Sequence, residues 1–152
     1  ALQRTLNPPS VYGPAEGELL LVGWGSTRGA IEEVVDMARE EGLSVSSVNI
    51  QFLSPLPPGL KEVLSAFKKV ITVELNYSDD WEDPLITRDN RRYGQLAWLL
   101  RASTLLDIDC VAKVPGRPLM PLEIVHEVKR ILGVKAEAPS EPQALPAAEG
   151  TT

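Results

Sequence analysis

The sequence predicts a small α/β domain of three layers, in which helices cover both faces of a mainly parallel sheet. Apolar, β-branched runs typical of buried parallel strands alternate along the chain with segments of helical periodicity. The connections between them are short, and such strand–helix–strand units form right-handed crossovers that place helices on the faces of the sheet. With 152 residues, of which 43% are hydrophobic, the chain can bury one substantial core.

The strongest single signal is the segment 17–27, in which an apolar run ends in two glycines and two hydroxyl residues. We expect a buried strand over 18–23 that turns sharply into a helix, because open α/β sheets place their ligands at such turns. Ser26 or Thr27 is expected to cap this helix with its side-chain oxygen. Apolar residues then recur at helical spacing until Gly42 supplies the stop.

The rest of the chain continues the same alternation. We expect strands over 43–52, 70–75 and 108–114, and helices over 60–68, 94–106 and 122–132, the last with Pro121 at its first position and Gly133 as its stop. Residues 1–16 are expected to form an N-terminal arm with a short edge strand near Val11. Residues 135–152 are rich in Ala, Pro, Glu and Ser and predict a disordered tail. The α/β domain itself is thus predicted to span 17–134.

The composition argues against several classes of function. A formal net charge of -6 is unfavourable for a nucleic-acid partner or an anionic membrane partner, both of which need a basic face. A single cysteine cannot build a disulfide framework or a Cys-based zinc or iron–sulfur site. No apolar run approaches the ~20 residues of a membrane span, and no signal peptide opens the chain, so we expect a cytoplasmic protein.

The glycine-rich turn resembles a dinucleotide-binding loop only superficially. Its spacing is G-x-G-x-x-x-G from Gly23, one residue longer than the fingerprint, and no Walker lysine follows. The end of the second strand carries Asn49, Ile50 and Gln51 where an acidic residue should meet the ribose. Two interpretations remain: a plain strand-to-helix turn, which we prefer, or a pocket of backbone N–H groups that holds a small anion.

No set of residues in the sequence forms a self-sufficient active site. His126 is the only histidine, and the apolar periodicity of its helix places it toward solvent. Cys110 lies within the fourth strand and is interpreted as a small core residue. Ser-His-Asp sets, carboxylate–histidine clusters and metal-ligand spacings are lacking. We therefore predict no catalytic residue and no metal site in this chain.

A crevice is predicted where the first and third strands end. If these strands are neighbours, Glu74 and Asn76 at the end of the third strand face the glycine-rich turn across the switch point. The alternative is that Asn76 only terminates its strand and Glu74 is solvated. The candidate crevice residues are Gly25, Ser26, Thr27, Glu74, Asn76, Gly94 and Gln95.

The segment 77–93 is unusually long for a connection in a compact domain. Its first half is acidic and its second half basic, and loops beyond ~12–15 residues tend to be functional or disordered. Aromatic and aliphatic residues within it indicate that it packs on something. We expect Trp81, Arg91 and Arg92 to contact a partner protein, with simple disorder as the alternative.

Six short motifs occur in an order that resembles one known family. They are Leu-Val-Gly-Trp-Gly-Ser-Thr (21–27), Glu-Gly-Leu-Ser-Val (41–45), Leu-Ser-Pro-Leu-Pro (53–57), Val-Glu-Leu-Asn (73–76), Gly-Gln-Leu-Ala (94–97) and Lys-Val-Pro-Gly-Arg-Pro (113–118). Over about 17–132 the series is similar to the C-terminal domain of the alpha subunit of 2-oxoacid:ferredoxin oxidoreductases, most like the 2-oxoglutarate type. The resemblance implies a transketolase C-terminal fold, a five-stranded sheet with one antiparallel strand, for which the edge strand near Val11 is the candidate.

The same resemblance implies a role without chemistry of its own. Complete enzymes of this family oxidatively decarboxylate a 2-oxoacid with coenzyme A, using thiamine diphosphate and Mg²⁺, and pass electrons through iron–sulfur clusters to ferredoxin. Their thiamine-binding domains lie in the preceding part of the alpha subunit and in the beta subunit, which would be partners of this domain. The chain is then a structural, subunit-contact domain that binds none of these cofactors alone, with 77–93 as an insertion.

Two other functions remain open from the residues themselves. One is a small α/β module that holds an anion or nucleotide at the glycine-rich turn. The other is an interaction module that acts through the loop 77–93.

Overall fold

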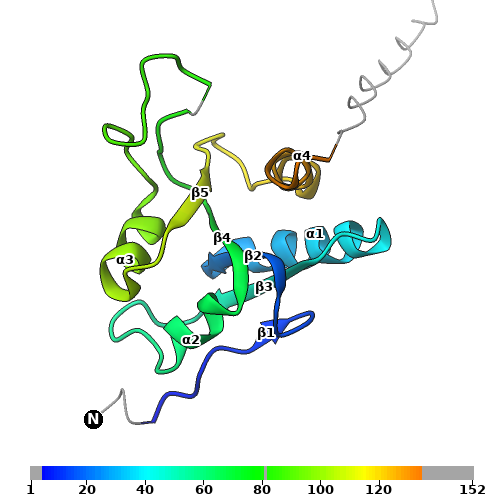
Figure 1. Ribbon diagram of the computed structural model, residues 1–152, viewed down its shortest axis with the longest axis vertical. Coiled ribbons are helices and arrows are strands. Elements are labelled where there is room, and N and C mark those ends of the chain that lie inside the picture. Colours follow the sequence, from blue (N-terminus) through cyan, green and yellow to red (C-terminus); the bar gives the residue numbers. More distant parts are fainter. Residues whose placement is uncertain (1–4, 81, 135–152) are drawn as a thin grey trace, which may run out of the picture.

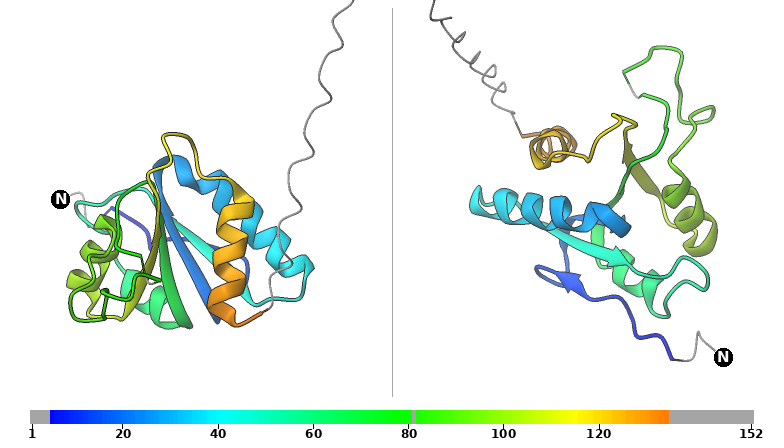
Figure 2. Two further views of the ribbon diagram at one scale, coloured as in Figure 1. Left: turned by 90° about the horizontal axis from the view of Figure 1, so that it is seen from above. Right: turned by 180° about the vertical axis from the view of Figure 1, so that it is seen from behind.

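The structure is a computed structural model that describes residues 5–80 and 82–134. It confirms the predicted fold class, because one mixed sheet lies between two layers of helices (Figures 1 and 2). The predicted tail over 135–152 lies outside the described residues. Among the described helices, none combines the length and apolar character needed to cross a membrane.

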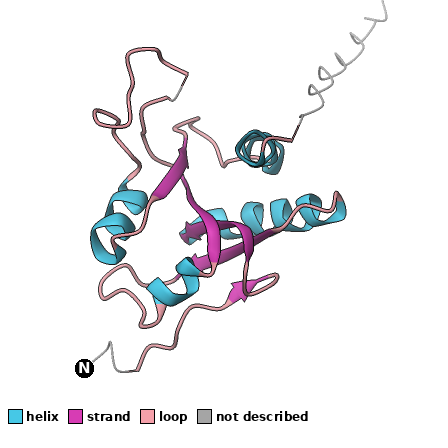
Figure 3. Ribbon diagram, viewed as in Figure 1, coloured by secondary structure: helices cyan, strands magenta, loops and turns pink. Residues whose placement is uncertain are grey.

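Within residues 5–80 and 82–134, the sheet has five strands in the order β1-β3-β2-β4-β5. They are β1 (Val11–Tyr12), β2 (Gly17–Trp24), β3 (Val45–Ile50), β4 (Phe67–Glu74) and β5 (Ile108–Ala112). β1 pairs antiparallel with β3 through Val11 and Val48, and the other pairs are parallel (Figure 3). The antiparallel edge strand that the family resemblance implies is therefore present.

In the described part of the chain, four α-helices cover the two faces of the sheet: α1 (Arg28–Glu40), α2 (Leu60–Ser65), α3 (Gln95–Thr104) and α4 (Pro121–Leu132). α1 and α4 pack on one face together with Leu19 and Leu21 of β2. α2 and α3 pack on the other face with Leu20 and Val22. Because successive side chains of β2 point to opposite faces and both faces are covered, this strand needs a continuous apolar run.

Several predicted boundaries are wrong by a few residues. The strands expected over 43–52 and 108–114 are shorter and span Val45–Ile50 and Ile108–Ala112. The helix expected over 60–68 ends at Ser65, and β4 begins at Phe67, which is buried and pairs with Gly17 of β2. The helix expected over 94–106 ends at Thr104, because Leu105 takes the left-handed conformation with φ 61°. A residue with positive φ ends the helical hydrogen-bond pattern.

The predicted side-chain cap of α1 is also wrong. Residues Gly25–Thr27 form a single 3₁₀ turn before the helix, and Thr27 itself has helical backbone angles. Its hydroxyl donates back to the carbonyl oxygen of Trp24 at 3.1 Å. The predicted stop at Gly42 is correct, with φ +80°.

Candidate functional site

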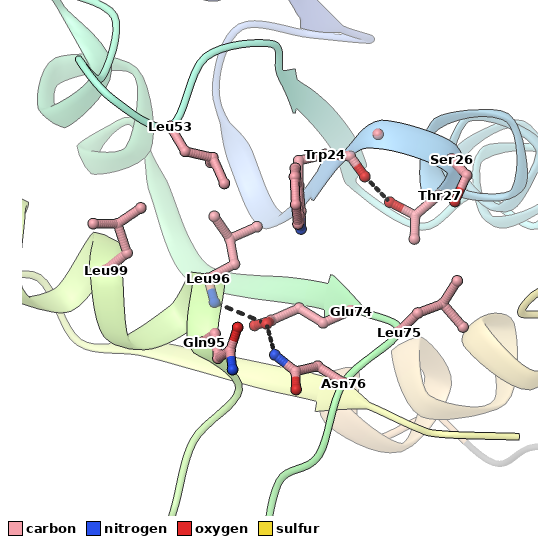
Figure 4. Close-up of a pocket in the computed structure, with 11 residues that line it drawn as sticks. Trp24, Ser26, Thr27, Leu53, Glu74, Leu75, Asn76, Gln95, Leu96 and Leu99 are labelled. Carbon is pink, nitrogen blue, oxygen red and sulfur yellow. Dashed lines mark hydrogen bonds between the residues drawn. The ribbon is translucent and has the colours of Figure 1, made fainter.

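The structure forms a pocket of about 470 Å³ at the carboxyl edge of the sheet. β2 and β4 are neighbours, so the ends of the first and third predicted strands lie side by side. The pocket opens between these ends and the start of α3 (Figure 4). It is lined by Trp24, Gly25, Ser26, Thr27, Leu53, Glu74, Leu75, Asn76, Gln95, Leu96 and Leu99.

Glu74 forms the floor of this pocket and is 2% exposed. Its carboxylate accepts hydrogen bonds from the backbone N–H groups of Leu96 at 2.8 Å and Ala97 at 3.0 Å. The hydroxyl of Thr72 donates a third bond at 2.6 Å. The interpretation of Glu74 as a solvated residue is therefore wrong: its carboxylate caps the amino end of α3, where a negative charge is favourable.

Gly94 does not line the pocket, but its lack of a side chain lets α3 approach the Glu74 carboxylate. The residue is the N-cap of α3 and offers no side chain for capping. A Cβ atom built there would lie 2.5 Å from Oε1 of Glu74. Only glycine fits this position while the carboxylate stays in place.

Asn76 and Gln95 line the pocket beside Glu74 (Figure 4). The amide Nδ2 of Asn76 is 3.5 Å from Oε2 of Glu74, and its Oδ1 accepts the N–H of Tyr77 at 2.8 Å. Gln95 is exposed at the first turn of α3. Six of the seven candidate crevice residues thus line one pocket, and the seventh, Gly94, lies beside the Glu74 carboxylate.

The turn 25–27 forms the opposite wall. Gly25 has φ +61°, and a Cβ atom at Gly23 would lie 2.3 Å from Cδ1 of Ile31, so both glycines are needed for the close strand-to-helix turn. Trp24, which sequence reasoning did not single out, stands at this wall with 48% of its surface exposed. The sequence contained a signal for Trp24, because this bulky residue comes directly after the buried run of β2.

The loop 77–93 is held closed at its base by Asp79 and Arg92. The backbone N–H of Asp79 donates to the carbonyl oxygen of Arg92 at 2.9 Å, and the guanidinium of Arg92 contacts the Asp79 carboxylate at 2.8 Å. The hydroxyl of Tyr77 donates to the same carboxylate. Hydrogen bonds from Arg92 hold the pKa of Asp79 well below its usual range. The third expected contact residue, Trp81, lies outside the described residues.

Arg91 requires a correction, because it is not available as a partner contact. Only 2% of its side chain is exposed. The guanidinium contacts the carboxylate of Asp109 at 2.5 Å and donates to the backbone carbonyl of Cys110 at 3.3 Å. Arg91 therefore ties the loop to the edge strand β5 of its own chain. Arg92, whose side chain is 70% exposed, keeps an accessible face.

His126 and Cys110 have the surface and core positions that the sequence predicted for them. His126 is exposed on α4. Cys110 is buried in β5, where its sulfur accepts the backbone N–H of Gly94 at 3.3 Å. Burial raises the pKa of the Cys110 thiol, which makes it a poor nucleophile.

The site therefore offers shape and hydrogen bonds rather than reactive groups. Within residues 5–80 and 82–134, no group of three His, Cys, Asp or Glu side chains is placed to hold a metal ion. The one carboxylate in the pocket is engaged with α3 and Thr72. Such a surface can receive an uncharged group from a neighbouring molecule, but it carries no general acid–base pair.

Comparison with known proteins agrees with this picture. The model of the pyruvate:ferredoxin oxidoreductase core domain II family matches residues 17–124, which run from β2 into the first turn of α4. The chain belongs to this family. The resemblance to alpha subunits of 2-oxoacid:ferredoxin oxidoreductases is thereby confirmed.

The curated relatives that match most of this chain are subunits of much greater length. The chain is 36% identical over 117 residues to subunit KorA of the 2-oxoglutarate oxidoreductase of Mycobacterium tuberculosis, covering 77% of this chain and 16% of KorA. Among solved structures, 2-oxoglutarate:ferredoxin oxidoreductase from Magnetococcus marinus, with 2-oxoglutarate, coenzyme A and succinyl-CoA bound, superposes with a TM-score of 0.70. It is 27% identical, over 85% of this chain and 20% of that one.

The fold also extends to transketolases. An inactive β4 tetramer of a split-gene transketolase superposes with a TM-score of 0.52 at 18% identity, over 78% of this chain and 39% of that one. This likeness shows the fold alone, and it agrees with the transketolase-type sheet expected from the sequence.

Proposed function

We propose that this domain is the structural, subunit-contact domain of a thiamine-diphosphate-dependent 2-oxoacid:ferredoxin oxidoreductase, with 2-oxoglutarate as the preferred substrate. The observation that carries the proposal is the family match over 17–124, which takes in four of the five strands. KorA and the Magnetococcus enzyme are both named for 2-oxoglutarate, which favours this substrate over pyruvate. The location proposed for the enzyme is the cytoplasm.

The cofactors of such an enzyme do not fit the described residues of this chain. Iron–sulfur clusters need several cysteine thiolates, and the sequence holds one cysteine, buried in β5. A divalent metal needs oxygen ligands that converge, and no described cluster provides them. Thiamine diphosphate, Mg²⁺ and the clusters therefore belong, in this proposal, to other parts of the alpha and beta subunits.

Coenzyme A is also a poor ligand for the pocket itself. Its phosphates favour cationic side chains and are repelled by an anion, and the only charged side chain that lines the pocket is the carboxylate Glu74. The same observation disfavours the anion- and nucleotide-binding alternative. The domain would instead hold neighbouring parts of the enzyme in place and so help to shape the approach of coenzyme A or substrate, with ferredoxin reached through the assembled complex.

An interaction role for the loop 77–93 remains compatible with this function. Arg92 and Tyr77 keep exposed faces at its base, and Leu85 near its tip is 78% exposed. Replacement of residues 80–90 by a short Gly-Ser linker in the full-length subunit should weaken binding of a partner if the loop contacts one. Unchanged assembly of the complex would remove this role and leave the main proposal intact.

The main proposal is tested by measuring oxidation of 2-oxoacids. The complete protein that carries this domain, together with its beta subunit, should reduce a viologen dye in the presence of coenzyme A and 2-oxoglutarate. The 152-residue chain alone, supplied with thiamine diphosphate and Mg²⁺, should give no turnover. Turnover by the isolated chain, or a complete protein that oxidises no 2-oxoacid, would refute the proposal.

A further inference from the structure

The strand β5 forms one edge of the sheet (Figure 1). Among the strands that the structure describes, it pairs only with β4. The opposite edge is formed by β1, which has two residues and is too short to offer a long ladder. An edge strand presents N–H and C=O groups to which a strand of another molecule can add. β5, with five residues, is therefore the edge at which this sheet could be extended.

Alternate residues of β5 direct their backbone groups to opposite sides of the strand. The N–H of Lys113, directly after the strand, donates to the carbonyl oxygen of Glu74 in β4 at 3.1 Å. The odd-numbered residues of β5 therefore direct their backbone groups toward β4. The even-numbered residues direct theirs away from the sheet, and these are Ile108, Cys110 and Ala112.

Side chains of the same chain already occupy three of these outward-facing groups. Arg101 donates to the carbonyl oxygen of Ile108 at 2.8 Å, and Arg91 donates to that of Cys110 at 3.3 Å. The N–H of Cys110 donates to the carboxylate of Asp109 at 2.7 Å. An added strand needs hydrogen bonds with the same groups, so it cannot pair at Cys110 while these side chains stay in place.

The two arginines are held in position by the end of the loop 77–93. Both guanidinium groups lie over the buried ring of Tyr93, that of Arg91 at 5.0 Å and that of Arg101 at 4.5 Å from its centroid. Arg91 also donates from Nε to the carbonyl oxygen of Asp79 at 3.3 Å. The side chain that blocks the middle of β5 is therefore packed into the domain and does not move freely at its surface.

The β5 strand of a second copy would fit this edge if the two arginines were absent. Two copies related by a twofold axis present the same surface to each other, and their β5 strands then run antiparallel. A pairing centred on Cys110 places Ile108 of one copy opposite Ala112 of the other, so the outward-facing groups meet in register. It places Asp109 opposite Val111, so two like charges do not stand opposite each other.

We propose that the β5 edge is a strand-pairing surface for a second copy of this domain, and that Arg91 and Arg101 block it. The end of the loop 77–93 then has a role of its own, because it keeps the sheet from associating edge to edge. This role is independent of the reaction that the complete enzyme catalyses.

Sedimentation equilibrium of the purified 152-residue chain in reducing buffer measures this self-association. Replacing both Arg91 and Arg101 by Ala releases two carbonyl oxygens in each copy. The dissociation constant of the dimer should then fall at least about tenfold relative to the parent chain, because these oxygens can accept hydrogen bonds across the interface. Replacing both Arg88 and Arg92 by Ala is the matched control, because it also removes two arginines, whose side chains pair with carboxylates rather than with the backbone of β5. Its dissociation constant should equal that of the parent.

A proline at the edge distinguishes strand pairing from unspecific association. The N–H of Ala112 faces outward, so Ala112→Pro removes a donor that an added strand needs and leaves the hydrogen bonds to β4 in place. Added to the variant that lacks Arg91 and Arg101, it should return the dissociation constant to the parental value. Association that the proline does not reverse would overturn the proposal, and so would a folded double variant that associates no more tightly than the control.

The single substitution Arg101→Ala decides the matter if circular dichroism shows that the double variant does not fold. The Arg101 side chain is 26% exposed, and its removal releases only the carbonyl oxygen of Ile108. This variant should lower the dissociation constant about threefold. An unchanged dissociation constant would overturn the proposal.

Discussion

The cap that Glu74 places on α3 provides the sharpest test of how the site is built. The carboxylate accepts hydrogen bonds from the backbone N–H groups of Leu96 and Ala97, which lie more than twenty residues further along the chain. It thereby replaces the side-chain cap that Gly94 cannot supply. Replacing Glu74 by Ala leaves both N–H groups and the hydroxyl of Thr72 without this acceptor inside the protein. We expect a large loss of stability.

The size of the loss follows from the bonds removed. A hydrogen bond to a charged group contributes about 1.5–3 kcal/mol, and loss of a helix cap alone costs about 1 kcal/mol. Two such bonds, less the desolvation that the buried carboxylate no longer suffers, give a loss of about 3 kcal/mol for Glu74→Ala. Glu74→Gln keeps one acceptor oxygen but turns an amide toward the second N–H group, so we expect a loss of about 1.5–2 kcal/mol.

Urea denaturation followed by tryptophan fluorescence measures both values. With a urea dependence of about 2 kcal/mol per molar, the Glu74→Ala midpoint should fall by about 1.5 M. Gln95→Ala is the matched control, because Gln95 is exposed in the same turn and no hydrogen bond of its side chain holds α3. Its midpoint should stay within about 0.3 M of the parent, since such surface changes stay within about 0.5 kcal/mol. A Glu74→Ala midpoint as high as that of the control would refute the capping role.

Three further predictions concern single positions. Gly94→Ala should lower the free energy of unfolding by about 2–3 kcal/mol, measured in urea, because its Cβ would lie 2.5 Å from the capping carboxylate. Gly29→Ala is the control and should be neutral or stabilising, because a Cβ atom there meets nothing within 4 Å. Equal effects of the two substitutions would contradict this prediction. Since Arg92 holds the pKa of Asp79 low, the pair stabilises the loop above the pH where an unfolded Asp titrates, near 3.8, and is lost only as pH falls further. The carboxyl carbon resonance of Asp79 should therefore show no inflection near pH 3.8, and an inflection there would contradict the pairing. Leu105→Gly should raise the free energy of unfolding by about 0.5–1 kcal/mol, because glycine adopts the left-handed conformation at φ 61° without strain, and a loss of stability would contradict that reading.

The fold was predictable to the extent that its signals are local. The buried run of β2 predicts a central parallel strand from its composition alone. The two residues of β1 carry no periodicity. The sequence predicted a short edge strand near Val11, and its antiparallel direction was implied by the family resemblance. The overextended helix at 60–68 has a physical cause: Leu60, Leu64 and Phe67 keep helical spacing, but pairing with β2 draws Phe67 into the sheet.

The location of the site was predictable because the sheet topology determines it. The hydrogen-bond partners of its side chains were not. The switch-point rule brings the end of β4 opposite the turn 25–27 without knowledge of any contact. The hydrogen bonds between Glu74 and the amino end of α3 join residues far apart in the sequence, and no sequence pattern predicts them. Arg91 was expected at the surface as part of a basic run, but the edge of β5 binds it instead.

The most direct test of the central claim is the activity of the complete enzyme beside that of this chain. The full alpha subunit with its beta subunit should couple oxidation of 2-oxoglutarate to reduction of a viologen dye only when coenzyme A is present. The 152-residue chain under the same conditions should show no reduction above the buffer. Dye reduction by the isolated chain, or none by the complete enzyme with any 2-oxoacid, would contradict the assignment of this domain as the non-catalytic part of such an oxidoreductase.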